Sequence, residues 1–153
     1  MVDIVDSATR SRMMANIKGK NTKPELLIRS LLHAQGFRFR IHRKDLPGKP
    51  DIVLPKYKAI IFIHGCFWHG HENCRLFKLP ASRTEFWEAK ICKNQKNDLA
   101  AKELLLKDGW RICTIWECAI RKSKKDPLAL MDILTKWLLS KESLVEITES
   151  IVL

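Results

Sequence analysis

The spacing of apolar positions changes along the chain, and these changes predict a series of helices and strands. Residues 23–36 place leucine and isoleucine three or four positions apart, which is the period of an amphipathic helix. Thr22 and Glu25 stand three residues apart at its start and predict a capping box, with Pro24 in the first turn. Gly36 is expected to end this helix.

The middle of the chain reads as strands. Residues 37–41 alternate apolar and basic side chains, as a half-buried strand does. Residues 46–50 contain two prolines and a glycine and predict a turn. Residues 51–54 and 59–64 then predict two strands joined by a hairpin loop over 55–58. The second of these strands is almost wholly apolar, as a central strand of a covered sheet is.

Residues 65–80 are expected to form an irregular loop, rich in cysteine, histidine and aromatic side chains. The elements predicted after it are a long helix over 84–107, a strand over 110–116 and an amphipathic helix from 127 to 139. Helices that alternate with strands in this order favour one mixed central sheet flanked by helices. The fold class expected is therefore α/β.

The length of 153 residues suits a single domain over 1–153. Within it, residues 1–20 form a basic segment with a short helix expected over 7–17, and residues 140–153 are expected to be a C-terminal tail. Lysine and arginine number 28 against 17 acidic residues, so the net charge is +11. That balance points to a polyanionic partner, usually nucleic acid, although a basic domain can also be merely soluble or adhere to membranes.

Targeting signals and cysteine usage narrow the setting. The sequence has no run of 18 apolar residues and no apolar signal-peptide core near its start, so a bacterial-type cytoplasmic location, with the DNA, is expected. Five cysteines without an export signal indicate metal binding more than a disulfide framework.

One acidic residue stands at the entrance of the predicted hairpin. If Leu54 lies opposite Ala59, Asp51 lies opposite Phe62 and has His64 as its diagonal neighbour on the same face. Diagonal neighbours lie about 7–8 Å apart, within reach of one ion or water. A carboxylate there can hold Mg²⁺, which offsets charge on a scissile phosphate. The alternative is that Asp51 only begins a strand after the turn.

Three further side chains are candidates for the same site. Glu25 can approach it from the first long helix, and its role in the capping box is an equally good explanation. His64 and His69 flank the start of the irregular loop. A neutral histidine can take a proton from an attacking water, because its ordinary pKa lies near neutral pH. Either histidine can instead be a structural hydrogen-bonding group.

Metal-ligating residues gather in the irregular loop. Three lie within nine residues and a fourth follows the strand over 110–116; they are Cys66, His71, Cys74 and Cys118. Three thiolates and one imidazole make a closed tetrahedral zinc site of the structural kind. His69 competes with His71 for the fourth position. Cys92 and Cys113 fit the alternative of unrelated thiols, one in a helix and one in a strand.

Aromatic side chains stand beside these ligands. Phe67 and Trp68 follow Cys66 directly, and Trp87 lies at the start of the long helix. Large aromatics in such a loop can be a small satellite core, or they can be wedges that enter a base stack. Met14, among basic residues near the start of the chain, poses the same question.

Together these motifs resemble the very short patch repair endonucleases. The resemblance runs from about residue 5 to residue 140. The matching stretches are Asp6–Ser11, Leu46–Asp51, Phe62–His69, Arg83–Trp87, Lys93–Asn94, Gly109–Arg111 and Trp116–Ala119. The match departs from the family pattern after Trp68, where Gly70, Glu72 and Asn73 replace a richer run of histidine and Cys74 stands one residue further along.

The resemblance implies a monomeric enzyme with a restriction-endonuclease-like core. It implies that Asp51 and the backbone carbonyl of Ile63 bind Mg²⁺. His69 would be the general base, with His64 assisting at the hydrated metal and Glu25 and Asp98 in support. The implied structural zinc ligands are Cys66, His71, Cys74 and Cys118, and the residues implied to intercalate into DNA are Phe67, Trp68, Trp87 and Met14.

The implied activity is a nick on the 5′ side of the thymine in a T·G mismatch that arises from deaminated 5-methylcytosine. Such an enzyme works alongside a DNA cytosine-5 methyltransferase, with a mismatch-repair scaffold protein as a further partner. Two other functions fit the same residues. One is a restriction-like endonuclease on other DNA, and the other is a non-catalytic, zinc-stapled DNA-binding module.

Overall fold

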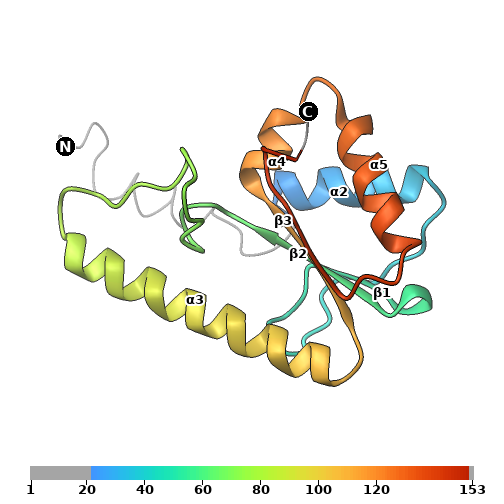
Figure 1. The fold of residues 1–153 in the computed structure, drawn as a ribbon, viewed down its shortest axis with the longest axis horizontal. Helices are drawn as coiled ribbons and strands as arrows, with labels where there is room; N and C mark the ends of the chain where they lie inside the picture. The colour runs from blue at the N-terminus through green and yellow to red at the C-terminus, as the bar shows by residue number, and fades with distance from the viewer. Residues whose placement is uncertain (1–21, 152–153) are drawn as a thin grey trace, which may run out of the picture.

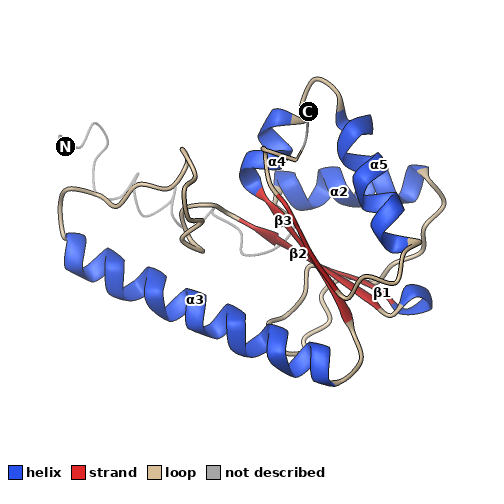
Figure 2. Ribbon diagram, in the orientation of Figure 1, coloured by secondary structure: helices blue, strands red, loops and turns tan. Residues whose placement is uncertain are grey.

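A computed structural model describes residues 22–151 of the chain. The helix expected over 7–17, and Met14 with it, lies outside the described residues. Within them the chain forms a four-stranded sheet with helices on both faces (Figures 1 and 2). The expected mixed α/β architecture is therefore confirmed.

The four strands are neighbours in the order in which the chain makes them. They are β1 (Ile52–Leu54), β2 (Ala59–His64), β3 (Arg111–Trp116) and β4 (Leu144–Ile147). β1 runs antiparallel to β2, whereas β2, β3 and β4 are parallel to one another. The hairpin has the expected register, with Leu54 opposite Ala59, although the loop between them closes as a short 3₁₀ turn over Pro55–Tyr57.

Helices cover both faces of this sheet, and Figure 1 shows α3 on one side with the other helices opposite. The helices are α2 (Lys23–Ala34), α3 (Thr84–Lys107), α4 (Glu117–Lys122) and α5 (Pro127–Leu138). Ile61 of β2 packs in the core that α2 and α5 complete, while Ile60 packs with Leu105 of α3. Because both faces are buried, β2 is apolar at nearly every position. Among residues 22–151, no helix combines the length and apolar character needed to cross a bilayer.

Only part of α3 covers the sheet. Ala101 and Leu105 are buried near its C-terminal end, whereas the N-terminal half runs past the sheet beneath the loop that follows β2 (Figure 1). Ile91 is the buried residue of this projecting half. The helix therefore packs against the sheet with its C-terminal end and against the irregular loop with its N-terminal half.

The prediction of a strand over residues 37–41 is wrong. Arg40 alone pairs, as a single bridge to Val53 of β1 with two backbone hydrogen bonds of 2.8 and 2.9 Å. β1 has only three residues to pair with, and His42 turns the chain away with a left-handed backbone (φ 58°). The alternating pattern of this segment reflects Phe37 and Phe39, which pack against the core.

The C-terminal tail expected over 140–153 contains a strand. β4 pairs in parallel with β3, and Ile147 is its one fully buried residue. The guanidinium of Arg111, in β3, holds the end of α5 and the turn before β4, because it donates to the carbonyls of Trp137, Leu138 and Glu142. Three of its four residues are apolar, but so short a run does not predict a strand without its partner β3.

Candidate active site and metal centre

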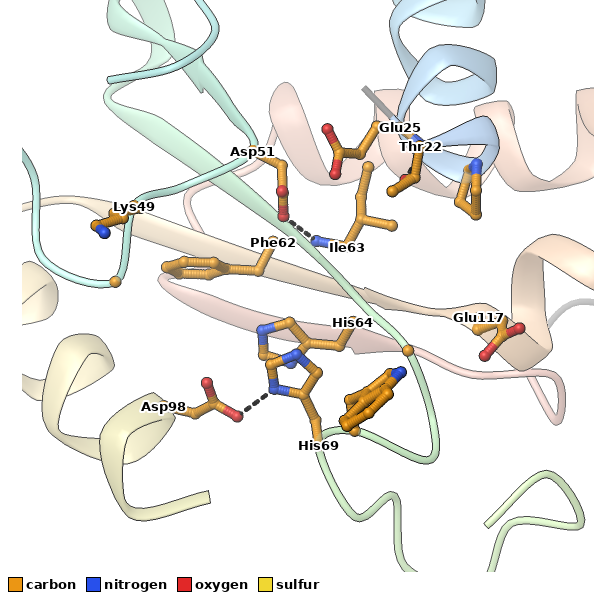
Figure 3. Close-up of a pocket in the computed structure, with 14 residues that line it drawn as sticks. Thr22, Glu25, Lys49, Asp51, Phe62, Ile63, His64, His69, Asp98 and Glu117 are labelled. Carbon is orange, nitrogen blue, oxygen red and sulfur yellow. Dashed lines mark hydrogen bonds and ion pairs between the residues drawn. The ribbon is translucent and has the colours of Figure 1, made fainter. Parts of the chain in front are cut away.

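A cavity of about 710 Å³ opens where β2 ends, and Figure 3 shows the side chains that line it. Five separate parts of the chain contribute, namely the start of α2, the residues before β1, the end of β2 with its following loop, α3, and the first residue of α4. The polar side chains expected at the site are all among the lining residues, which include Glu25, Asp51, His64, His69 and Asp98.

Asp51 is held at the entrance of the hairpin by the neighbouring strand. Its Oδ2 accepts a hydrogen bond of 2.7 Å from the backbone N–H of Ile63. Burial raises the pKa of Asp51 to about 7, against the opposing effect of this hydrogen bond, and the charge of Glu25 raises it further. Two carboxylates this close suit a cation between or beside them, and their hard oxygen atoms suit Mg²⁺.

Glu25 stands in the first turn of α2, with its backbone at the helix cap and its carboxylate at the cavity. Its backbone N–H donates to Oγ1 of Thr22 at 3.4 Å, which is one half of the expected capping box. Its carboxylate is buried at the cavity and accepts a hydrogen bond of 3.0 Å from Arg29. The helix start therefore delivers an acidic group to the cavity beside Asp51.

A second group faces Asp51 across the cavity (Figure 3). Nδ1 of His69 lies 2.6 Å from Oδ2 of Asp98 on α3. Because an ionised carboxylate only accepts, Nδ1 donates this hydrogen bond and Nε2 of a neutral ring keeps its lone pair. His69 is thus oriented by the Asp98 carboxylate in a way that suits a general base.

His64 stacks directly on His69, with ring centroids 3.7 Å apart and planes 3° apart. These two side chains are called the histidine pair below. Burial lowers the pKa of His64 to about 3, and the nearby His69 lowers it further, so His64 is neutral at pH 7. Among the described residues, its Nδ1 is buried without a hydrogen-bond partner.

The four expected zinc ligands come together in space. Their ligand atoms all lie within 4.8 Å of one another; they are Cys66, His71, Cys74 and Cys118, called the cysteine cluster below. Sγ of Cys118 lies 3.7 Å from Nδ1 of His71. His71, and not His69, therefore stands beside the thiols. Cys92 is exposed on α3 and Cys113 is buried in β3, apart from the cluster.

The cysteine cluster has the chemistry of a metal site. Burial raises the pKa of the Cys66 and Cys118 thiols, which would stay protonated without a metal. Three sulfur atoms and one imidazole suit Zn²⁺, and bound zinc would replace the thiol protons.

The aromatic residues form a cluster beside the cavity. The ring centroid of Phe67 lies 5.2 Å from that of Trp68 and 5.6 Å from that of Trp87, and Phe86 lies 5.2 Å from Trp87. Trp68 and Phe86 remain 42% and 45% exposed. Lys90 lies 5.8 Å above the ring of Trp68. Exposed aromatic faces next to a cation suit nucleic acid, while their mutual contacts give them a packing role as well.

The contacts that hold the loop against α3 were not predicted from the sequence. Gln95 on α3 donates to the carbonyl of Gly70 at 2.9 Å, and Asn94 donates to that of Trp68 at 2.9 Å. Gly70 has φ 59°, and a Cβ there would lie 2.6 Å from Ile91. Polar residues on a helix surface carry no pattern that reveals such contacts, so only the structure shows how α3 fixes the loop.

Comparisons with known proteins place the chain among DNA endonucleases. A family model described as DNA mismatch endonuclease Vsr matches residues 2–75. The type II nicking enzyme V.XorIIP of Xanthomonas oryzae pv. oryzae is 47% identical over 115 residues, covering 75% of this chain and 84% of that protein. The DNA mismatch endonuclease Vsr of Escherichia coli is also 47% identical over 115 residues, covering 75% of this chain and 73% of that protein.

Replacement of Asp51 by asparagine is expected to stabilise the protein without added Mg²⁺ at pH 8 by about 1–3 kcal/mol. The folded pKa of about 7 exceeds the ordinary value of 3.8, so ionisation of Asp51 costs stability as the pH rises between them. Asparagine can still accept the hydrogen bond from Ile63. Urea unfolding at pH 4 and pH 8 measures the effect.

At pH 4 the gain should fall below about 1 kcal/mol, because the Asp51 carboxyl group is then neutral in the folded chain and only about half ionised in the unfolded chain. An equal gain at both pH values would show that ionisation of Asp51 is not its cause.

Replacement of Cys118 by serine is expected to reduce bound zinc well below one per chain and to lower the melting temperature. A metal bound by the fold contributes its binding free energy to stability. Elemental analysis and thermal melts measure both effects, with Cys92→Ser as the control because Cys92 is an exposed thiol on α3. Full zinc content in Cys118→Ser would remove Cys118 from the ligand set.

Proposed function

The chain belongs to the Vsr family of DNA mismatch endonucleases, and on that premise we propose that it nicks duplex DNA 5′ to the thymine of a T·G mismatch. The Escherichia coli relative is named a mismatch endonuclease, and other relatives are named nicking enzymes. One observation carries the proposal: the Asp98–His69 pair faces the half-buried carboxylate of Asp51 across a single cavity.

His69 is the proposed general base. Asp98 fixes its ring through Nδ1, so Nε2 can take a proton from a water that attacks the phosphate. The flat contact with His64 restricts the ring further, and His64, being neutral, adds no positive charge that would oppose proton uptake. The histidine pair thus presents one oriented base to the cavity.

Asp51 and the backbone carbonyl of Ile63 are the proposed ligands of Mg²⁺, with Glu25 in support. When bound there, Mg²⁺ offsets negative charge on the scissile phosphate. The raised pKa of Asp51 fits this role, because a bound cation restores the ionised form that burial disfavours. The hydrogen bond from Ile63 keeps the carboxylate at the end of β2.

The cysteine cluster is proposed to hold one structural zinc. Four protein ligands leave no open position for chemistry, so the metal would tie the loop after β2 to the start of α4. Residues 1–153 would then act as one monomeric endonuclease domain with a restriction-endonuclease-like core.

The proposed biological role is repair of deaminated 5-methylcytosine in the cytoplasm. The flanking sequence would follow a partner DNA cytosine-5 methyltransferase, and a mismatch-repair scaffold protein would assist. A net charge of +11 supports attraction to the duplex. The proposed wedge of Phe67, Trp68 and Trp87 would enter the stack beside the wobble pair, which is easier to unstack than a matched pair. Met14 would enter from the minor groove.

The test is a panel of end-labelled duplexes with Mg²⁺, each carrying T·G in a different flanking sequence, beside the matched T·A and C·G duplexes. We expect a single nick in the thymine strand, on its 5′ side, in at least one T·G flank, and none with Asp51→Ala. Removal of the metal ligand should spare binding, because it harms the transition state more than the ground-state complex.

Equal cutting of matched and mismatched duplexes would favour a restriction-like endonuclease instead. Binding without any cutting would favour a zinc-stapled DNA-binding module.

Replacement of Trp68 by alanine is expected to slow nicking of T·G DNA at least about tenfold, or about 1.4 kcal/mol of transition-state free energy. Stacking on an aromatic contributes about 1–3 kcal/mol per base, close to the cost of unstacking one step. The variant is first melted and then assayed well below its melting temperature, with a fluorescent base analogue beside the mismatch. A less stable variant that cuts normally, with the same fluorescence change, would make Trp68 a packing residue only.

A further inference from the structure

Trp116 lies between the cysteine cluster and the histidine pair. Its ring stacks flat on that of His71, with centroids 4.0 Å and planes 5° apart. Its ring also packs edge to face against His64, with ring centroids 5.3 Å and planes 79° apart. The ring centroid of His69 lies 6.5 Å from that of Trp116. One buried indole therefore contacts a candidate zinc ligand and both members of the histidine pair.

The parallel register of the two central strands fixes this position. Trp116 is the last residue of β3 and is the Cα partner of His64, the last residue of β2. Two residues beyond each strand stands a cysteine, and the backbone N–H of Cys118 donates to Sγ of Cys66 at 3.3 Å. A metal that holds both cysteines would hold the two strand ends level, and Trp116 with them.

The loop that carries His69 depends on the same contacts. The backbone N–H of His71 donates to the carbonyl of Cys66 at 2.9 Å, and that of His69 donates to the carbonyl of Gly65 at 3.1 Å. His69 and His71 are two residues apart, so the stacking of His71 on Trp116 restrains the backbone that positions His69. Asp98 restrains the His69 ring itself, through Nδ1, and not the backbone that carries it.

We propose that Trp116 is a positioning residue through which the cysteine cluster sets the geometry of the histidine pair, an inference that rests on the proposed nicking activity. His71 stacks on the face of the Trp116 ring, and His64 packs against the same ring edge to face. An aliphatic side chain of similar bulk would fill the space without presenting either surface. A displacement of about 1 Å at a reacting group can cost on the order of 100-fold in rate.

Trp110 provides a matched control in the same strand region. It is 8% exposed, against 7% for Trp116, and the indole nitrogen of each is buried without a hydrogen-bond partner among the described residues. Its ring packs with Phe62 and Leu105, under Lys58. Loss of either indole removes a comparable amount of core, but only Trp116 contacts the histidine pair.

The experiment compares Trp116→Leu, Trp116→Phe, Trp110→Leu and Trp110→Phe in the zinc-loaded protein. Zinc content, melting temperature, affinity for T·G duplex and single-turnover nicking rate are measured for each, all assays well below the lowest melting temperature. We expect Trp116→Leu to keep one zinc and to bind duplex within about threefold of wild type, but to nick at least about tenfold more slowly. Trp116→Phe should nick at close to the wild-type rate. Both Trp110 variants should be less stable than wild type but should keep its nicking rate.

Nicking by Trp116→Leu within threefold of wild type would overturn the inference, as would an equal loss of rate in Trp110→Leu. Loss of zinc from Trp116→Leu would also overturn it, because Trp116 would then act on the metal site and not on the histidines. Wild-type protein is assayed in parallel. Failure of the wild type to nick any T·G duplex would count against the proposed function itself, whereas a variant-specific result concerns Trp116 only.

Discussion

The parallel pairing of β2 with β3 is the constraint on which the rest of the site depends. It places His64 level with Trp116, and it makes both strands end at the same edge of the sheet. Parallel strands require a crossover connection, and α3 provides it while also supporting the loop that carries His69 and His71. Cavity, histidine pair and cysteine cluster are therefore consequences of one register, and a shift of one residue would turn His64 to the opposite face.

Much of this arrangement could be predicted from the sequence, and the exceptions have physical reasons. The apolar run of β2 and the breaks at Pro80 and Gly109 on either side of α3 are strong local signals, so the hairpin register and the bounds of α3 were as expected. The segment over 37–41 has the right alternation, but β1 is too short to pair with it. β4 is the reverse case, because a run of four residues is too short to predict a strand without its partner β3. The choice of His71 over His69 beside the thiols follows from the hydrogen bond between His69 and Asp98, which no spacing rule contains.

The cavity concentrates groups that are costly in a folded core. Asp51 is half-buried with a raised pKa, and His64 is buried with an unpartnered nitrogen among the described residues. The surrounding sheet, whose residues are buried on both faces, offsets these costs. Local departures from good packing and pairing are expected where a protein binds a cation and moves protons, and here they coincide with the cavity at the end of β2.

The separation of the cysteine cluster along the chain has a consequence for its synthesis. Cys118 follows Cys74 by 44 positions, and all of α3 lies between them. At about 5–20 residues per second, a ribosome adds the last ligand roughly 2–9 s after the third. For that interval the nascent chain carries two thiols and an imidazole with no strand β3 to enclose them. The cysteine cluster can therefore close only after α3 and β3 have been made, which couples any metal binding there to a late stage of synthesis.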